Sequence, residues 1–249
     1  MSRYFLEVAY KGTSYSGFQV QDNANTIQAE IQQALFTVCR SVILLTGSSR
    51  TDAGVHALQN FFHFDYEGAI HPQLAYKLNA VLPNDIAVRH VYTMHDSAHS
   101  RFDALSRHYE YRVYGKKDPF IRETAYYFPY TVDHTLLQET AYIIRQQTNF
   151  FAFSKTNTAV KHFNCQVEVS EWRREGEVLI YSIQANRFLR GMVRSLTGAQ
   201  LQVSRGTIEI SSFVRLFLEG GGKCRYSLPP TGLFLNKVAF PAAFFGKKP

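Results

Sequence analysis

The sequence predicts an α+β fold in two halves, each built on a mainly antiparallel sheet. Short segments that alternate apolar and polar residues, such as 4–10 and 107–114, recur along the chain and indicate strands. Segments with apolar residues every three or four positions lie between them and indicate helices. The strand–helix order of the first half resembles that of the second. We therefore interpret the halves as pseudo-repeats, with domains at residues 1–105 and 106–249.

The first half is predicted to run strand, helix, strand, strand, helix, strand. Asn25 is expected to cap the first helix, with Gln28 closing a capping box. Pro72 suits the first turn of the second helix, because its missing N–H would be unpaired there. The expected strands are residues 4–10, 42–46, 57–66 and 86–94, and the expected helices are 25–38 and 71–81.

The second half adds a hairpin and three helices. Asp133 is a favourable cap for the first of these helices. The turn of the hairpin is expected around Gly176, between two alternating segments. The expected strands are residues 107–114, 166–173, 178–185 and 233–240, and the expected helices are 134–146, 188–203 and 211–219.

Composition points to an ordinary globular protein with an anionic partner. Hydrophobic residues make up 45% and charged residues 19% of the chain, and the formal net charge is +7. This charge favours nucleic acid over a membrane, since no basic amphipathic helix of membrane type is seen. No run of 18 apolar residues occurs. The three widely spaced cysteines suggest neither a metal site nor disulfides. We therefore expect the protein to be located in the cytoplasm, which is reducing.

The loop at residues 48–57 contains the most informative residues. It lies between two apolar segments, and its Asp52-Ala53-Gly54 sequence is typical of a turn. Asp52 could simply cap its own backbone there. Alternatively, a carboxylate beside Arg50 on a rigidly held loop could be a reactive group.

Basic residues cluster near the expected helix 188–203. Arg187, Arg190 and Arg194 have the spacing of one helix face. They could form a solvated basic face, contact phosphates or pair with a carboxylate. The spacing of His56 and His63 does not suit a metal site. The sequence also lacks a phosphate-binding glycine loop and the usual nucleophile motifs.

Several blocks, taken together and in order, resemble the TruA-type tRNA pseudouridine synthases. The resemblance covers residues 4–240, and the segment R-T-D-A-G-V-H-A is its most specific block. The blocks are Y-K-G-T-S-Y-S-G-F-Q (10–19), R-T-D-A-G-V-H-A (50–57), L-N-A-V-L-P (78–83), S-R-F-D-A (100–104), R-H-Y-E-Y (107–111), M-V-R (192–194) and P-T-G-L (230–233).

This resemblance implies a pseudouridine synthase fold with a central sheet and a basic cleft, usually as a homodimer. It implies isomerisation of uridine at positions 38, 39 and 40 in the anticodon stem-loop of tRNA, without cofactor or metal. Asp52 matches the catalytic aspartate, and Arg50 the arginine associated with extruding the target nucleotide. Tyr109 matches the tyrosine that packs on the target base, and Arg194 the arginine that pairs with the aspartate. The expected substrate-binding residues are Tyr109, Arg187, Arg190 and Leu233.

The sequence departs from the family pattern near the loop. Ser49 replaces the usual glycine before the arginine, and Gln59-Asn60 stand where Gly-Gln is common. These departures, and the Asp and His residues of the loop, leave two other functions to consider. One is a non-catalytic protein that binds or folds tRNA with the same cleft, and the other is an Asp/His metal hydrolase. Ligand spacing disfavours the hydrolase.

Overall fold

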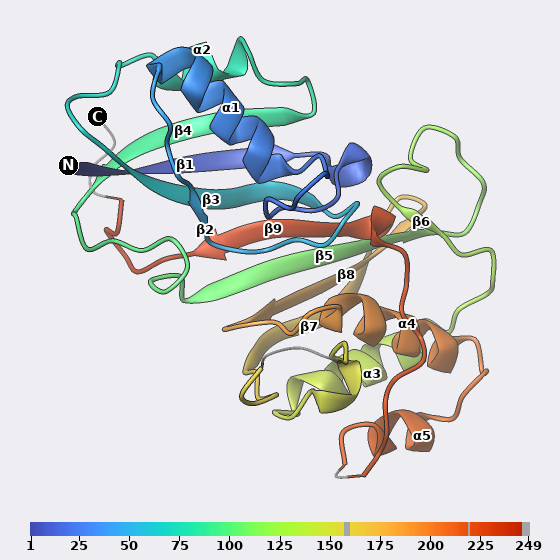
Figure 1. Cartoon of the computed structure of the whole chain (residues 1–249). Helices are drawn as coiled ribbons and strands as arrows, with labels where there is room; N and C mark the ends of the chain where they lie inside the picture. The colour runs from blue at the N-terminus through green and yellow to red at the C-terminus, as the bar shows by residue number, and fades with distance from the viewer. Residues whose placement is uncertain (157–159, 219, 246–249) are drawn as a thin grey trace. The chain divides into compact units, whose positions relative to one another are not determined.

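The chain folds into two compact units, and each contains both helices and strands (Figure 1). The computed structural model describes residues 1–156, 160–218 and 220–245. Unit 1 comprises Met1–Leu105 together with the described chain from Phe234 onward, and unit 2 comprises Ser106–Leu233. No helix among these described residues is long and apolar enough to cross a membrane.

The sheet of unit 1 is mainly antiparallel. Strand β1 (Ser2–Tyr10) lies between β4 (Ile86–Met94) and β3 (His56–Tyr66), antiparallel to both. The short β2 (Thr46–Gly47) pairs antiparallel with β3, and β9 (Leu233–Ala239) pairs parallel with it. The central position of β1 explains why it is buried along most of its length.

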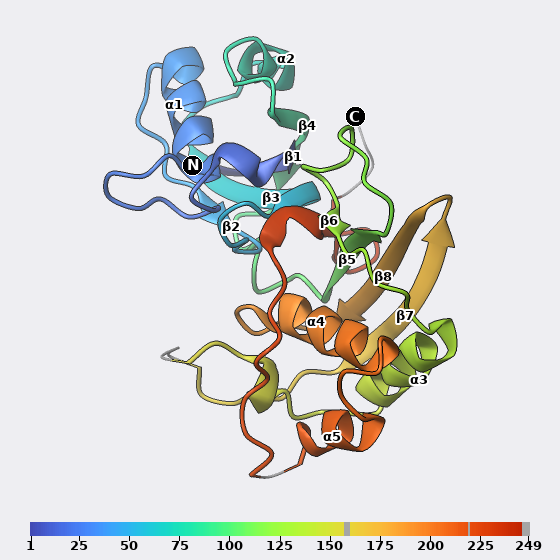
Figure 2. The same cartoon turned by 90° about the vertical axis from the view of Figure 1, so that its right-hand side faces the viewer.

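The two faces of this sheet are covered differently. Helices α1 (Ile27–Cys39) and α2 (Leu74–Asn79) lie on the same face (Figures 1 and 2). Phe5 alternates with Tyr4 and Leu6 along β1 and so points to the other face. There its ring contacts aromatic residues near the end of the described chain, namely Phe240, Phe244 and Phe245.

The sheet of unit 2 contains β5 (Ser106–Tyr114), β8 (Val178–Ala185) and β7 (Val167–Glu175), antiparallel in that order. Strand β6 (Tyr126–Tyr127) pairs parallel with β5. The helices are α3 (His134–Arg145), α4 (Met192–Ser204) and α5 (Ile210–Arg215). The buried indole of Trp172 donates to Gln200 on α4 at 2.9 Å, and Gln138 on α3 donates to its carbonyl at 2.6 Å. These bonds fasten both helices to β7. Short 3-10 helices occur at Gly12–Ser14, Phe151–Phe153 and Pro230–Gly232.

The α+β class with mainly antiparallel sheets is confirmed, and so is the cap of α3. Asp133 accepts hydrogen bonds from the backbone of Thr135 and Leu136 at 2.7 and 3.1 Å. The predicted cap of α1 is wrong. Thr26 caps this helix by accepting from the backbone of Ala29 at 3.3 Å, while Gln28 donates to the carbonyl of Leu45.

Three predicted elements are shorter than expected. The segment 42–46 forms a strand only from Thr46, because only Thr46 and Gly47 have partners on β3. The helix expected at 71–81 is limited to α2, and Val81 is exposed rather than facing inward. Of the helix expected at 211–219, α5 covers residues up to Arg215, and residue 219 lies outside the described residues.

The sequence suggested one boundary between the two halves, whereas the chain passes from unit 1 to unit 2 and then returns to unit 1. A single boundary would leave residues 106–249 together, whereas the described chain from Phe234 onward belongs to unit 1. The physical reason is that His56 and Ala57 of β3 pair with Phe234 and Leu235 of β9.

A buried histidine should make unit 1 sensitive to acid. Burial and the neighbouring His99 and Arg3 lower the pKa of His63 from 6.5 to about 4. The unfolded chain therefore takes up a proton at this side chain at a higher pH than the folded chain does. We expect the free energy of unfolding to fall as the pH decreases from about 6.5 towards 4.

Urea unfolding across this pH range would measure the effect. His63→Gln should flatten the pH dependence, whereas His71→Gln, at an exposed position, should leave it as in the wild type. An equal slope in His63→Gln and wild type would contradict the assignment.

Candidate functional site

The loop with Asp52 and Arg50 connects β2 to β3 in unit 1. Its start is fixed on β3, because the Ser48 N–H donates to the carbonyl of Phe61 at 2.8 Å. Ser49 and Thr51 are buried, whereas Arg50 is exposed and Asp52 is half-buried. The loop therefore alternates between side chains that anchor it and charged side chains that remain accessible.

A buried hydrogen-bond cluster holds the backbone beside Asp52. The hydroxyls of Thr51 and Tyr10 are 2.9 Å apart. The buried amide of Asn60 donates to the Tyr10 hydroxyl at 3.1 Å and to the carbonyl of Ser49 at 2.9 Å. Burial raises the pKa of Tyr10 to about 12, so its hydroxyl keeps its proton at neutral pH. We call Tyr10, Thr51 and Asn60 the anchor cluster.

The segment 11–18 braces the same loop from outside. The backbone of Phe18 donates to the carbonyl of Thr51 at 3.1 Å, and the backbone of Gly54 donates to that of Tyr15 at 3.3 Å. A Cβ at Gly12 would overlap the carbonyl of Val55. Glycine is thus needed for this close approach. Residues 10–19 form one of the blocks that resemble the family, and their two glycines were the available signal for the close packing.

In unit 2, Tyr109 occupies β5 opposite Ile183 of β8. Its ring meets the ring of Phe188 edge to face, with centroids 5.0 Å apart, and it is 8% exposed. This contact restricts the orientation of the Tyr109 ring. Phe188 was missed as a site-supporting residue, because it was assigned to the start of an expected helix.

The three arginines do not share a helix face, so that prediction is wrong. Helix α4 begins at Met192, after Gly191 in a left-handed conformation (φ +76°), and only Arg194 lies on it. Arg187 contacts His162 Nε2 at 3.0 Å. Arg190 is exposed, and its carbonyl accepts from the backbone of Lys155 at 3.0 Å. The chain before α4 therefore holds Arg187 and Arg190 independently of the helix.

Arg194 is joined to the segment that leads to Leu233. Its Nε donates to the carbonyl of Leu228, whose N–H donates back to the carbonyl of Arg194 at 3.3 Å. The Tyr111 hydroxyl donates to the carbonyl of Pro229 at 2.6 Å. These bonds fix the segment on α4 and β5, and Leu233 at its end is buried.

The predicted site residues thus fall into two groups. Asp52 and Arg50 share one loop of unit 1. The residues of unit 2 lie on a strand, on the chain before α4, on α4 and at the start of β9, namely Tyr109, Arg187, Arg190, Arg194 and Leu233. Within the described ranges there is no group of three or more His, Cys, Asp or Glu side chains that could hold a metal ion.

Gln59 stands where the family commonly has a glycine, and its side chain makes no hydrogen bond to the loop within the described part of the chain. Its amide donates to Glu7 at 2.8 Å and accepts from the backbone of Val238 at 3.2 Å. The next residue, Asn60, belongs to the anchor cluster, and consecutive strand residues point to opposite faces. Gln59 therefore connects β3 with β1 and β9 on the face opposite to that of Asn60.

Comparison with known proteins assigns the family. The family model described as tRNA pseudouridine synthase matches residues 7–103 and 147–241, which include parts of both units. A tRNA pseudouridine synthase A from Parabacteroides distasonis is 41% identical, covering 98% of each chain. The enzyme of that name from Bacteroides fragilis is 40% identical, covering 98% of this chain and 99% of the relative. That from Staphylococcus aureus is 33% identical, covering 95% and 90%.

This chain belongs to the tRNA pseudouridine synthase family. Members of the family are isomerases that act on tRNA.

The anchor cluster gives a direct test of how the loop is held. Tyr10→Phe removes one hydroxyl and leaves polar groups of Thr51 and Asn60 short of a buried partner. This should lower the free energy of unfolding by about 1–3 kcal/mol and speed amide hydrogen exchange at residues 51–54.

Tyr4→Phe is the matched control. Tyr4 lies on the same strand and is equally buried, but its hydroxyl makes only a long contact of 3.5 Å with the carbonyl of Gly68. Equal exchange rates at residues 51–54 in the two variants would show that Tyr10 does not hold the loop.

Proposed function

We propose that this protein converts uridine to pseudouridine at positions 38, 39 and 40 in the anticodon stem-loop of tRNA, with Asp52 as the catalytic residue. Family membership supports the reaction class. The observation that carries the assignment of Asp52 is the anchored loop. Its backbone is held on both sides of Thr51, while the carboxylate of Asp52 stays partly accessible.

The reaction needs a carboxylate and a displaced base, but no redox change. The bond between ribose C1′ and uracil N1 breaks, the base turns, and C5 is joined to C1′. C5 then loses its proton and N1 gains one, so the product is an isomer of uridine. Asp52 in its ionised form can attack C1′, as a carboxylate does in retaining glycosidases. It can equally take a proton from the sugar to start an elimination. In either route, a rigid loop reduces the freedom that must be lost at the transition state.

The target nucleotide must leave the stacked stem, at a cost of a few kcal/mol. Arg50 is exposed two residues before Asp52, and we assign it to displacing this nucleotide. We assign Tyr109 to packing on the extruded base, since Phe188 restricts its ring. Arg187, Arg190 and the region of Leu233 are assigned to further substrate contacts. Phosphate contacts by arginine would offset part of the cost of extrusion.

Arg194 is assigned to pairing with the Asp52 carboxylate. A guanidinium holds a carboxylate with two parallel hydrogen bonds and favours its ionised form. The bonds between Arg194 and Leu228 would restrict the orientation of the guanidinium.

The remaining expectations concern the assembly and its setting. We propose a homodimer that acts on tRNA in the cytoplasm. All three cysteines are free thiols, which suits a reducing compartment. Light scattering at several protein concentrations would test the dimer, and a mass of one chain throughout would exclude it.

Asp52→Asn should abolish pseudouridine formation and leave tRNA affinity nearly unchanged. A neutral amide cannot act as nucleophile or base, while one loop carboxylate contributes little to an interface dominated by phosphates. Mapping of pseudouridine in unmodified tRNA and equilibrium binding would measure the two effects. Asp22→Asn, at an exposed position, serves as the control.

Turnover by Asp52→Asn, once deamidation is excluded, would contradict the catalytic role. Wild-type protein that binds tRNA but forms no pseudouridine would instead identify a non-catalytic binder.

Arg194→Lys should slow the chemical step while preserving affinity. The ammonium keeps the positive charge but cannot make two parallel hydrogen bonds. Loss of orientation at Asp52 should lower the single-turnover rate at saturating enzyme on the order of a hundredfold. The salt dependence of tRNA binding should not change.

Arg145→Lys on α3 is the control for the same exchange at an exposed position. The thermal unfolding of both variants should also be measured, because Arg194 bonds to Leu228 and its substitution could change the stability of the fold. A wild-type single-turnover rate in Arg194→Lys would exclude a catalytic role for the pairing.

A further inference from the structure

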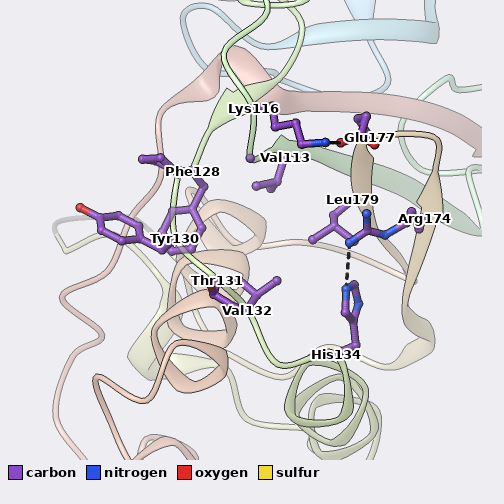
Figure 3. Close-up of a pocket in the computed structure, with 12 residues that line it drawn as sticks. Val113, Lys116, Phe128, Tyr130, Thr131, Val132, His134, Arg174, Glu177 and Leu179 are labelled. Atoms are coloured by element: carbon purple, nitrogen blue, oxygen red, sulfur yellow. Dashed lines mark hydrogen bonds and ion pairs between the residues drawn. The ribbon is translucent and has the colours of Figure 1, made fainter.

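Unit 2 contains a hollow of about 440 Å³ that includes none of the site residues discussed above (Figure 3). Buried apolar residues line part of it, namely Val113, Phe128 and Leu179. Exposed side chains with nitrogen donors reach it from three separate segments. They are Lys116 after β5, His134 at the start of α3, and Arg174 on β7.

The charge of Arg174 is not balanced by a carboxylate. Figure 3 shows its guanidinium facing His134, and the two nitrogens are 3.0 Å apart. Because arginine can only donate, His134 Nε2 is the acceptor in this contact. In contrast, the adjacent Arg173 bonds to Glu110 and Glu175. Within the described part of the chain, no Asp or Glu lies at ion-pair distance from Arg174.

The acidic groups around the hollow are already engaged. Asp133 accepts from two backbone N–H groups of α3. Glu177 pairs with Lys116 at 3.1 Å, and both side chains are well exposed, so this pair contributes little. A further cation, Arg205, lies 3.7 Å over the ring of Tyr130 at the hollow. The region therefore favours an anion.

The loop that continues from Lys116 presents an aromatic ring to solvent. Phe120 is 94% exposed. Its backbone is nevertheless held, because its N–H donates to Asp118 at 2.8 Å and Thr124 donates to the carbonyl of Ile121 at 2.9 Å. Lys117 and Arg122 are exposed on either side of it in the sequence. An exposed aromatic ring on a held backbone, with Lys117 and Arg122 near it in the sequence, is suited to stacking on a nucleobase.

We propose that the hollow and the loop 116–122 form a second RNA-binding surface for the same tRNA substrate. Arg174 and Lys116 contact backbone phosphates, and Phe120 stacks on an unpaired base nearby in the same tRNA. Arg174 exchanges its imidazole partner for a phosphate on binding. This inference rests on the proposed function, because that function supplies the RNA.

The phosphate contact is tested by Arg174→Gln, with Arg145→Gln as the matched control on the same unit. Loss of one phosphate contact should weaken tRNA binding and reduce the log–log salt slope by about 0.9 or slightly less. The control should leave the slope as in the wild type.

The stacking contact is tested by Phe120→Ala and Phe120→Trp. The alanine variant should bind tRNA more weakly, by on the order of tenfold, without a change in salt slope. The tryptophan variant should keep wild-type affinity, and tRNA should quench its fluorescence. The native Trp172 is buried, so tRNA should not quench its fluorescence, which gives a constant background signal. Tyr142→Ala, which removes an exposed aromatic from α3, is the control.

Single-turnover rates at saturating enzyme should match the wild type in all these variants, because the surface binds and does not react. The proposal is wrong if Arg174→Gln has the slope of Arg145→Gln, or if Phe120→Ala binds as tightly as Tyr142→Ala. Failure of the proposed function is distinguishable, since wild-type protein would then form no pseudouridine whatever these affinities show.

Discussion

The candidate site depends most on the buried hydrogen bonds among Tyr10, Thr51 and Asn60. These residues come from β1, from the loop and from β3, so the bonds fix the loop to the centre of the sheet of unit 1. Buried polar groups are costly when unpaired, which means that the loop has few alternative positions with all partners satisfied. A carboxylate next to such an anchor is placed by the backbone and needs little help from its own side-chain packing.

The brace from the segment 11–18 adds a steric constraint to this anchor. Gly12 and Gly17 allow the two backbones to approach closely, and Gly17 has a φ of +102° that favours glycine. Hydrogen bonds from Phe18 and Gly54 then join the segments directly. The loop is consequently held by backbone contacts outside and side-chain contacts inside. Arg50 and Asp52 remain as its accessible charged groups, which is the arrangement a reactive loop requires.

Local patterns predicted the elements with strong periodicity and failed where tertiary contacts decide. Helix α3 and strand β4 follow from spacing and from the Asp133 cap. The start of α4 was misplaced because residues 188–191 have apolar spacing, whereas Gly191 takes a left-handed conformation before the helix. Strand β9 belongs to unit 1 because it pairs with β3, a strand that is far from it in the sequence. No local pattern encodes either feature.

The same distinction applies to the site. Family resemblance was enough to propose Asp52, Arg50, Tyr109 and Arg194, since the motifs contain these residues. The supporting roles of Tyr10, Asn60 and Phe188 were not predicted. Their roles come from contacts that only the folded chain creates.

These contacts also explain how the chain accommodates its departures from the family pattern. Asn60 uses its amide to hold Ser49 and Tyr10, and Ser49 is buried beside Ser48 with their hydroxyls 3.5 Å apart. Gln59 faces the other way and joins β3 to β1 and β9. The departures therefore alter how the loop and its sheet are supported, while the accessible charged positions 50 and 52 keep the Arg and Asp that the family motif contains. A change in the support can be compatible with the same chemistry, provided that every buried polar group finds a partner.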